Sequence, residues 1–145
     1  MTELLVPPVG PLVAARAYLL DELAARDNPL SVGVIPPAGE PNSYALLSRP
    51  GGAVRAFLAD YLIRVRVFDA DAVRLEQNAD LLHRLMLTVA HRQITTDQGA
   101  VWIAGAKAQS LPSSLDDPDV PLFGMQMAVF WTIGLRPETP APPAP

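Results

Sequence analysis

The chain contains no cysteine, only two histidines and few charged residues, which make up 18% of it. The lack of cysteine excludes disulfides, thiolate metal sites and cysteine nucleophiles. The formal net charge of −4 leaves no basic excess of the kind that proteins use to bind the phosphate backbone of nucleic acids. No apolar run is long enough to cross a bilayer, and the start, MTELLVPPVG, lacks the features of a signal peptide. We therefore expect a protein that is made in the cytoplasm and binds neither membranes nor specific nucleic-acid sequences.

The short motifs that carry common chemistry are also missing. There is no G-x-G-x-x-G or G-K-[ST] loop for phosphate groups, and no G-x-S-x-G turn for a serine nucleophile. His83 and His91 lie two turns apart on a predicted helix, which is too far for both to bind one metal ion. We therefore interpret both histidines as solvated or at the rim of the core, predict no catalytic residue, metal site or cofactor, and expect that the chain is not an enzyme.

Three aspartates, Asp116, Asp117 and Asp119, lie in a segment from Ser110 to Pro121 that is rich in serine and proline. They could chelate a hard cation, but the segment lacks the glycine-kinked pattern of a calcium loop. Its composition predicts a long exposed loop without regular structure. Either the aspartates form a solvated acidic cluster on an outer loop, or the loop lies at an assembly surface, where they contact a partner.

What the chain does have is a strand that leads directly into a helix, between Tyr61 and Arg92. Apolar residues alternate along the strand from Tyr61 to Phe68, and then recur every three or four residues along the helix. The predicted helical stripe consists of Leu75, Ala79, Leu82, Met86 and Val89.

Charged side chains mark both ends of that helix. Asp69 is the predicted N-cap and Asp71 the acidic residue of the first turn, while Arg84, His91 and Arg92 suit the carbonyl end. These charges agree with the apolar stripe about where the helix begins and ends.

The remaining segments are assigned by the same periodicities. We expect an extended lead-in to Gly10, then a helix over about residues 12–26 whose buried stripe is Val13, Ala17, Leu20 and Ala24, with Leu23 beside it. Residues 31–35 and 44–48 are predicted to pair as a hairpin, and Arg49 to Gly52 to break the chain. Further strands are expected at 94–96, at 101–108 with a bulge at Gly105, and at 125–136.

These elements predict an α+β fold with a single antiparallel or mixed sheet and two helices packed on one face. The 145 residues have room for one domain, which we place at residues 1–136. The proline-rich segment 137–145 is expected to be a disordered tail.

Arg64 and Arg66 are the most conspicuous polar residues of the predicted sheet. They alternate with apolar residues, so both point to one face, where two guanidinium groups repel each other. Either carboxylates of the same chain balance them, or they contact another subunit.

The order of elements resembles one known family. A helix opening after a proline (PLVAARAYLLDEL) is followed by a hairpin, and an R-x-R strand then leads into a long helix (IRVRVFDADAVRLEQNADLLHRLM). Two closing strands with an extended loop between them complete the domain. Over about residues 5–136 this order resembles the tail terminator proteins of long-tailed bacteriophages.

The resemblance implies a structural virion protein at the head–tail junction, assembled in the host cytoplasm. Members of that family form a ring, usually of six subunits, on the tail-tube protein; the ring stops tube growth and presents its other face to the head-completion proteins of the neck. DNA passes through the lumen without specific binding. If the loop with Asp116, Asp117 and Asp119 lies in that lumen, their negative charge would repel passing DNA. Two alternatives stay open: a head-completion or connector protein of the neck, and a small ligand-binding or enzymatic α+β domain.

Overall fold

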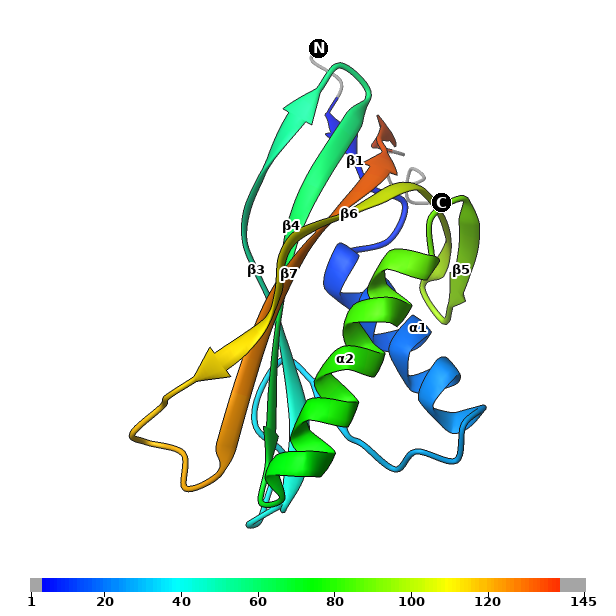
Figure 1. Cartoon of the computed structure of the whole chain (residues 1–145). Helices are drawn as coiled ribbons and strands as arrows, with labels where there is room; N and C mark the ends of the chain where they lie inside the picture. The colour runs from blue at the N-terminus through cyan, green and yellow to red at the C-terminus, as the bar shows by residue number, and fades with distance from the viewer. Residues whose placement is uncertain (1–3, 139–145) are drawn as a thin grey trace.

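The computed structural model describes residues 4–138, which form two helices and eight strands (Figure 1). In chain order these are β1 (Leu5–Val6), α1 (Pro11–Ala24), β2 (Val32–Gly33), β3 (Ser43–Arg55), β4 (Leu58–Asp69), α2 (Ala72–Thr88), β5 (Arg92–Thr96), β6 (Gly99–Leu115), β7 (Phe123–Gly134) and β8 (Arg136–Pro137).

Six of the strands form one curled sheet in the order β2-β3-β4-β7-β6-β5. Only β2 and β3 run parallel; the other neighbours are antiparallel, so the sheet is mixed. Both helices lie on the same face of this sheet (Figure 1), and the core residues of α1, α2 and the strands form one continuous cluster. The predicted α+β fold is confirmed, with the addition of a small second sheet in which β1 pairs with β8.

Helix α2 begins two residues later than the sequence indicated. Its N-cap is Asp71, whose Oδ1 accepts hydrogen bonds from the amides of Val73 (2.9 Å) and Arg74 (3.3 Å). Asp69 is the last residue of β4 and is fully buried, so its prediction as N-cap was wrong. Its carboxylate instead accepts two 2.8 Å hydrogen bonds from the Arg74 guanidinium and one from the amide of Asp71. The predicted apolar stripe of α2 is confirmed, because all five of its residues are buried.

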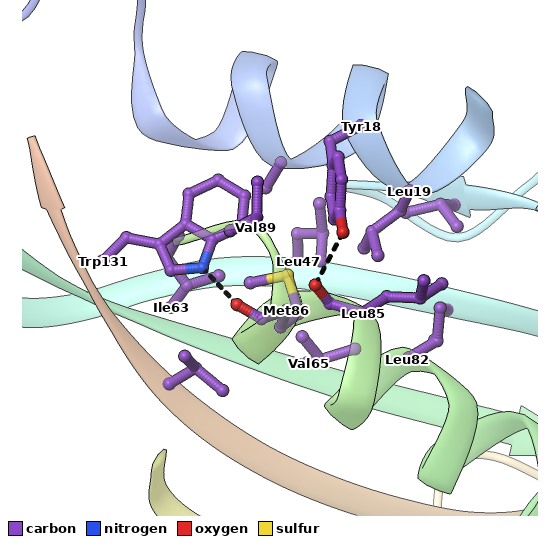
Figure 2. Close-up of a cluster of buried hydrophobic side chains, with 14 of the residues drawn as sticks. Tyr18, Leu19, Leu47, Ile63, Val65, Leu82, Leu85, Met86, Val89 and Trp131 are labelled. Atoms are coloured by element: carbon purple, nitrogen blue, oxygen red, sulfur yellow. Dashed lines mark hydrogen bonds between the residues drawn. The ribbon is translucent and has the colours of Figure 1, made fainter. Parts of the chain in front are cut away.

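The C-terminal end of α2 is buried between α1 and the sheet. The last four carbonyls of a helix have no amide partner within it. Two of these groups are satisfied by aromatic side chains from other elements: Tyr18 donates its hydroxyl to the Leu85 carbonyl, and Trp131 its indole N–H to the Met86 carbonyl, each at 2.8 Å (Figure 2). These bonds join α1 and β7 to the same turn of α2.

The buried face of α1 differs from the predicted stripe. The buried residues are Pro11, Ala14, Ala15, Tyr18, Leu19 and Leu23, whereas Ala24 is exposed and the other predicted positions are half-buried. Apolar residues surround this helix on nearly every side, so their spacing does not select one face. Contacts with β5, α2 and β3 select it instead.

The predicted hairpin between residues 31–35 and 44–48 was also wrong. Val32 and Gly33 pair in parallel with Ala45 and Leu46, and β3 then continues through the expected break to Arg55. Pro50 is accommodated because it lies at an irregularity between Ser48 and Gly51, on a stretch of β3 that β2 no longer covers. The resulting β3–β4 hairpin is long and extends well beyond the helices (Figure 1).

The loop predicted at Ser110 to Pro121 is shorter than expected. Strand β6 continues to Leu115, with register shifts at Gly105, as predicted, and around Pro112. The connection to β7 therefore covers only residues 116–122. The long last strand is confirmed as β7. Of the predicted tail, Pro137 pairs with Leu5 and residues 139–145 lie outside the described part of the chain.

Candidate functional site

The face of the six-stranded sheet that is opposite the helices is our candidate functional surface, and we call it the open face. Residues that pair across antiparallel strands point to the same side of a sheet. Because Ile63, Val65 and Val67 of β4 point into the core, the residues between them, Leu62, Arg64 and Arg66, point to the open face.

The cross-strand neighbours of Arg64 and Arg66 on this face are all uncharged. Arg64 lies between Ser48 of β3 and Ala128 of β7, and Arg66 lies between Leu46 and Gln126. The three ion pairs found within residues 4–138 use Arg26, Arg55 and Arg74, so neither guanidinium is balanced by a carboxylate of the described chain. In addition, the Nε of Arg66 is buried without a hydrogen-bond acceptor.

A hollow of about 620 Å³ lies on the open face, and one of its lining residues, Leu62, is two residues from Arg64 on β4. It is lined by Gly52, Ala53, Arg55, Asp60, Leu62, Lys107, Phe130 and Thr132. The exposed Lys107 pairs in register with Phe130, which pairs with Leu62, so the open face carries a third cation beside apolar side chains. The sequence prediction missed Lys107. Side chains alternate between the two faces along β6, so counting from the predicted bulge at Gly105 could have indicated the face to which Lys107 points.

Asp60, which lines the hollow, is held in a polar network. Its carboxylate accepts hydrogen bonds from Arg55 (2.7 and 3.1 Å) and from the Thr132 hydroxyl (2.5 Å). The hydrogen bonds from Arg55 and Thr132 lower the pKa of Asp60 below its ordinary value. This network joins β3, β4 and β7. The other cation that lines the hollow, Lys107, forms no ion pair with any of the described residues.

The acidic segment 116–122 forms the tip of the β6–β7 hairpin, which we call the acidic tip. Val120 and Leu122 pack against a small second cluster made of Tyr44, Leu46 and Phe68, and this contact anchors the tip. Asp117 Oδ1 accepts the amide of Asp119 at 3.0 Å, while Asp116 and Asp119 are exposed. The predicted acidic cluster is therefore an ordered turn, and none of its carboxylates forms an ion pair within residues 4–138.

The two predicted groups of site residues form no ion pair with each other among the described residues. The acidic tip nevertheless lies on the same face as the arginines, because Val120 and Leu122 pack against the cluster that contains Leu46, and Leu46 is the cross-strand neighbour of Arg66. Arg64 and Arg66 do share a face, as expected.

Exposed apolar side chains occur at both ends of the elongated sheet. Val54 and Phe57, each 68% exposed, lie at the tip of the β3–β4 hairpin. Phe123, 57% exposed, lies at the base of the acidic tip, at the opposite end of β4 and β7, where it pairs with Asp69. The sequence analysis did not single out these residues, because a lone apolar residue next to a turn looks the same whether it is buried or exposed.

The histidine prediction is corrected in part. His83 is buried, because it follows Ala79 by four residues and precedes Met86 by three, which places it beside the apolar stripe of α2. His91 is exposed, in a left-handed backbone conformation just after the helix. No group of three or more histidines, aspartates and glutamates that could hold a metal ion occurs within residues 4–138.

Neither helix of the described chain is long and apolar enough to cross a bilayer. No known protein-family model matches the sequence, and a search of curated proteins finds no significant match.

Proposed function

We propose that this protein is a structural, non-enzymatic subunit of a phage tail, which assembles as a closed ring on the end of the tail tube, stops its growth and joins it to the head. The order of elements that resembles tail terminators supports the proposal. The fold adds a specific observation: three chemically different surfaces surround one core, namely the open face, the acidic tip and the apolar tip of the β3–β4 hairpin.

The positions of these surfaces support a role as a ring subunit. The open face is free of helices, and the two hairpin tips lie at opposite ends of the sheet, each with exposed apolar side chains (Figure 1). A subunit in a ring contacts two neighbours, a tube on one side and a neck on the other. Exposed apolar residues at both ends of a small domain mark such contact regions.

The observation that carries the proposal is the placement of Phe57 and Phe123 at the two ends of the same sheet. Burial of a phenylalanine side chain contributes about 1.5–3 kcal/mol, so six copies arranged in a ring would provide a substantial apolar rim at each end. Contacts at two opposite ends suit a protein that links a tube to a neck.

The decisive experiment is deletion of the gene from a phage that encodes it, followed by electron microscopy of the lysate. Tube subunits bury the same interface at each addition, so without a cap the tube continues to grow. We expect overlong tails that are not attached to heads. Free tails of normal length would instead support the alternative function, a head-completion or connector protein.

Binding of a small molecule is a second candidate function, because the open face contains a hollow. It has the size of many ligand sites and brings Arg55, Asp60 and Lys107 together. However, Arg55 and Asp60 are already paired with each other, which leaves one cation for a ligand. A deletion phage with normal tails and normal heads would favour this candidate.

A further inference from the structure

We propose that neighbouring copies in the ring are joined by docking of the acidic tip of one copy on the open face of the next, so that Asp116 and Asp119 face Arg64, Arg66 and Lys107. This inference rests on the proposed function for the ring itself, and adds the contact that builds it.

The first argument is charge. The open face carries three cations, Arg64, Arg66 and Lys107, that form no ion pair with any residue in the described range 4–138. The acidic tip carries three carboxylates in the same situation. Complementary surfaces of this kind steer association and fix its register. Within one chain the two groups form no ion pair with each other, although Val120 and Leu122 fasten the tip to the cluster of Tyr44, Leu46 and Phe68 on the same face.

The second argument is shape and rigidity. The tip is a compact turn that contains Pro118 and Pro121 and is braced by the bond from the Asp119 amide to Asp117. A rigid projection loses little conformational entropy on docking. The receiving surface has a hollow that begins at Leu62, two residues along β4 from Arg64, and Leu62 and Phe130 supply apolar area there for the proline rings.

The third argument is symmetry. The tip and the open face are different patches of one molecule, so a contact between them is heterologous. Repeated contacts of this kind generate rings when the rotation closes, whereas identical patches that meet each other generate dimers. The occupant of the open face is therefore a second copy of this chain.

Charge reversal tests the contact in the full-length protein. The double substitution Arg64→Glu and Arg66→Glu reverses the charge of the open face. The double substitution Asp116→Lys and Asp119→Lys reverses the charge of the acidic tip and keeps Asp117, which braces the turn. Each pair of changes should weaken ring formation at least about tenfold, measured by sedimentation in the presence of tube protein. The combined variant should regain most of the association, because the complementary charges are exchanged rather than lost.

A matched control changes the same charges elsewhere. Arg84 and Arg92 are exposed near the end of α2, and their replacement by glutamate should leave ring formation unchanged. Thermal unfolding of every variant shows whether it is folded. If both reversed variants are folded and assemble like the natural protein, or if the combined variant does not recover, the proposed contact is wrong.

A cross-linking experiment on assembled tails gives an independent result. Because the chain has no cysteine, Arg66→Cys combined with Asp116→Cys introduces one pair of thiols. A short bis-maleimide should then link successive copies into a ladder on a denaturing gel, whereas Arg84→Cys with Asp116→Cys should give no ladder. Monomers alone from the first variant would overturn the proposal.

The outcomes also separate this contact from the proposed function. If phages that carry the charge-reversed variants all make tails of normal length, the capping function is supported and the proposed contact between tip and open face is wrong. If rings form and respond to charge exchange as expected but tubes still grow past them, the contact is correct and the capping function is wrong.

Discussion

The ring of Tyr18 meets the indole of Trp131 edge to face, with centroids 6.2 Å apart and planes inclined by 72°. Tyr18 comes from α1 and Trp131 from β7, and each also donates a hydrogen bond to the last turn of α2. One aromatic contact therefore lies where both helices and the central part of the sheet meet (Figure 2). Edge-to-face pairs contribute about 0.5–1.5 kcal/mol beyond the area that they bury.

Tyr18→Phe is expected to lower the free energy of unfolding by about 1–2 kcal/mol. The ring and its contact with Trp131 remain, but the buried Leu85 carbonyl loses its donor. Urea denaturation measures the change. Tyr61→Phe is the matched control, because Tyr61 is only half-buried and its hydroxyl forms no hydrogen bond within residues 4–138, so its effect should stay within about 0.5 kcal/mol. Equal effects at the two positions would contradict the assigned role of Tyr18.

Arg74→Gln is expected to destabilise the protein by about 2 kcal/mol at neutral pH, because Asp69 would keep a buried charge without its cation. Arg26→Gln is the control, since its pair with Glu22 is exposed on both sides and such pairs contribute little.

The same pair makes stability depend on pH. Burial alone would raise the pKa of Asp69, but the hydrogen bonds from Arg74 and the Asp71 amide, with the charge of Arg74, lower it overall. A lowered pKa in the folded state means that this contribution is fully present above the ordinary carboxyl pKa of about 3.9 and is lost as pH falls below it. In Arg74→Gln the lowering by Arg74 is absent and burial raises the folded-state pKa of Asp69. The contribution of this group is then present at low pH and is lost as pH rises above the ordinary carboxyl value, so the variant should lose less stability on acidification than the natural protein. Urea midpoints measured between about pH 3 and pH 7 would reveal this difference.

Gly52→Ala is expected to destabilise the β3–β4 hairpin by about 1–3 kcal/mol, because Gly52 has a φ of +145° and an added Cβ would collide with the Asp60 carbonyl. Gly51→Ala is the neighbouring control: a Cβ there meets nothing within 4 Å. Hydrogen exchange of the hairpin amides and urea unfolding would compare the two. A larger effect at Gly51 would contradict the described hairpin geometry.

Leu82→Asp should reproduce the phenotype of the deletion phage, since Leu82 is fully buried on the stripe of α2 and an unpaired charge there costs several kcal/mol. That loss approaches the whole stability of a small domain. Glu76→Asp, on the exposed side of the same helix, should leave tails normal. Normal tails from the Leu82 variant would mean that the folded chain is not needed for termination.

The sequence predicts those parts of the fold in which a periodic pattern meets a clear boundary. The β4–α2 unit and β7 were predicted because Ile63, Val65 and Val129 lie on strictly alternating strands. The buried face of α1 could not be predicted, since an apolar helix offers several possible faces. The parallel pairing of Val32 with Ala45 was missed because nearby strands most often form hairpins, and here contacts distant in sequence decide the pairing.

The candidate site was predicted only in part, for a related reason. Arg64 and Arg66 were found because two charges stand out in an apolar strand. Lys107 joins them through the pairing of β6 with β7, and a register shift at Gly105 sets its side of the sheet. The exposure of Phe57 and Phe123 depends on how far two hairpins extend beyond the helices, which no local pattern encodes.

The position of β7 has a consequence for how the chain folds. This strand is the last long one to be synthesised, yet it lies between β4 and β6, and Ile63 pairs with Val129. During synthesis, the edges of β4 and β6 that pair with β7 therefore lack their backbone hydrogen-bond partners until nearly the whole chain has left the ribosome. Pairings between such distant residues slow folding and expose strand edges that can aggregate. We expect the protein to fold after synthesis rather than during it, and a nascent chain that ends before Phe123 to depend on chaperones for its solubility.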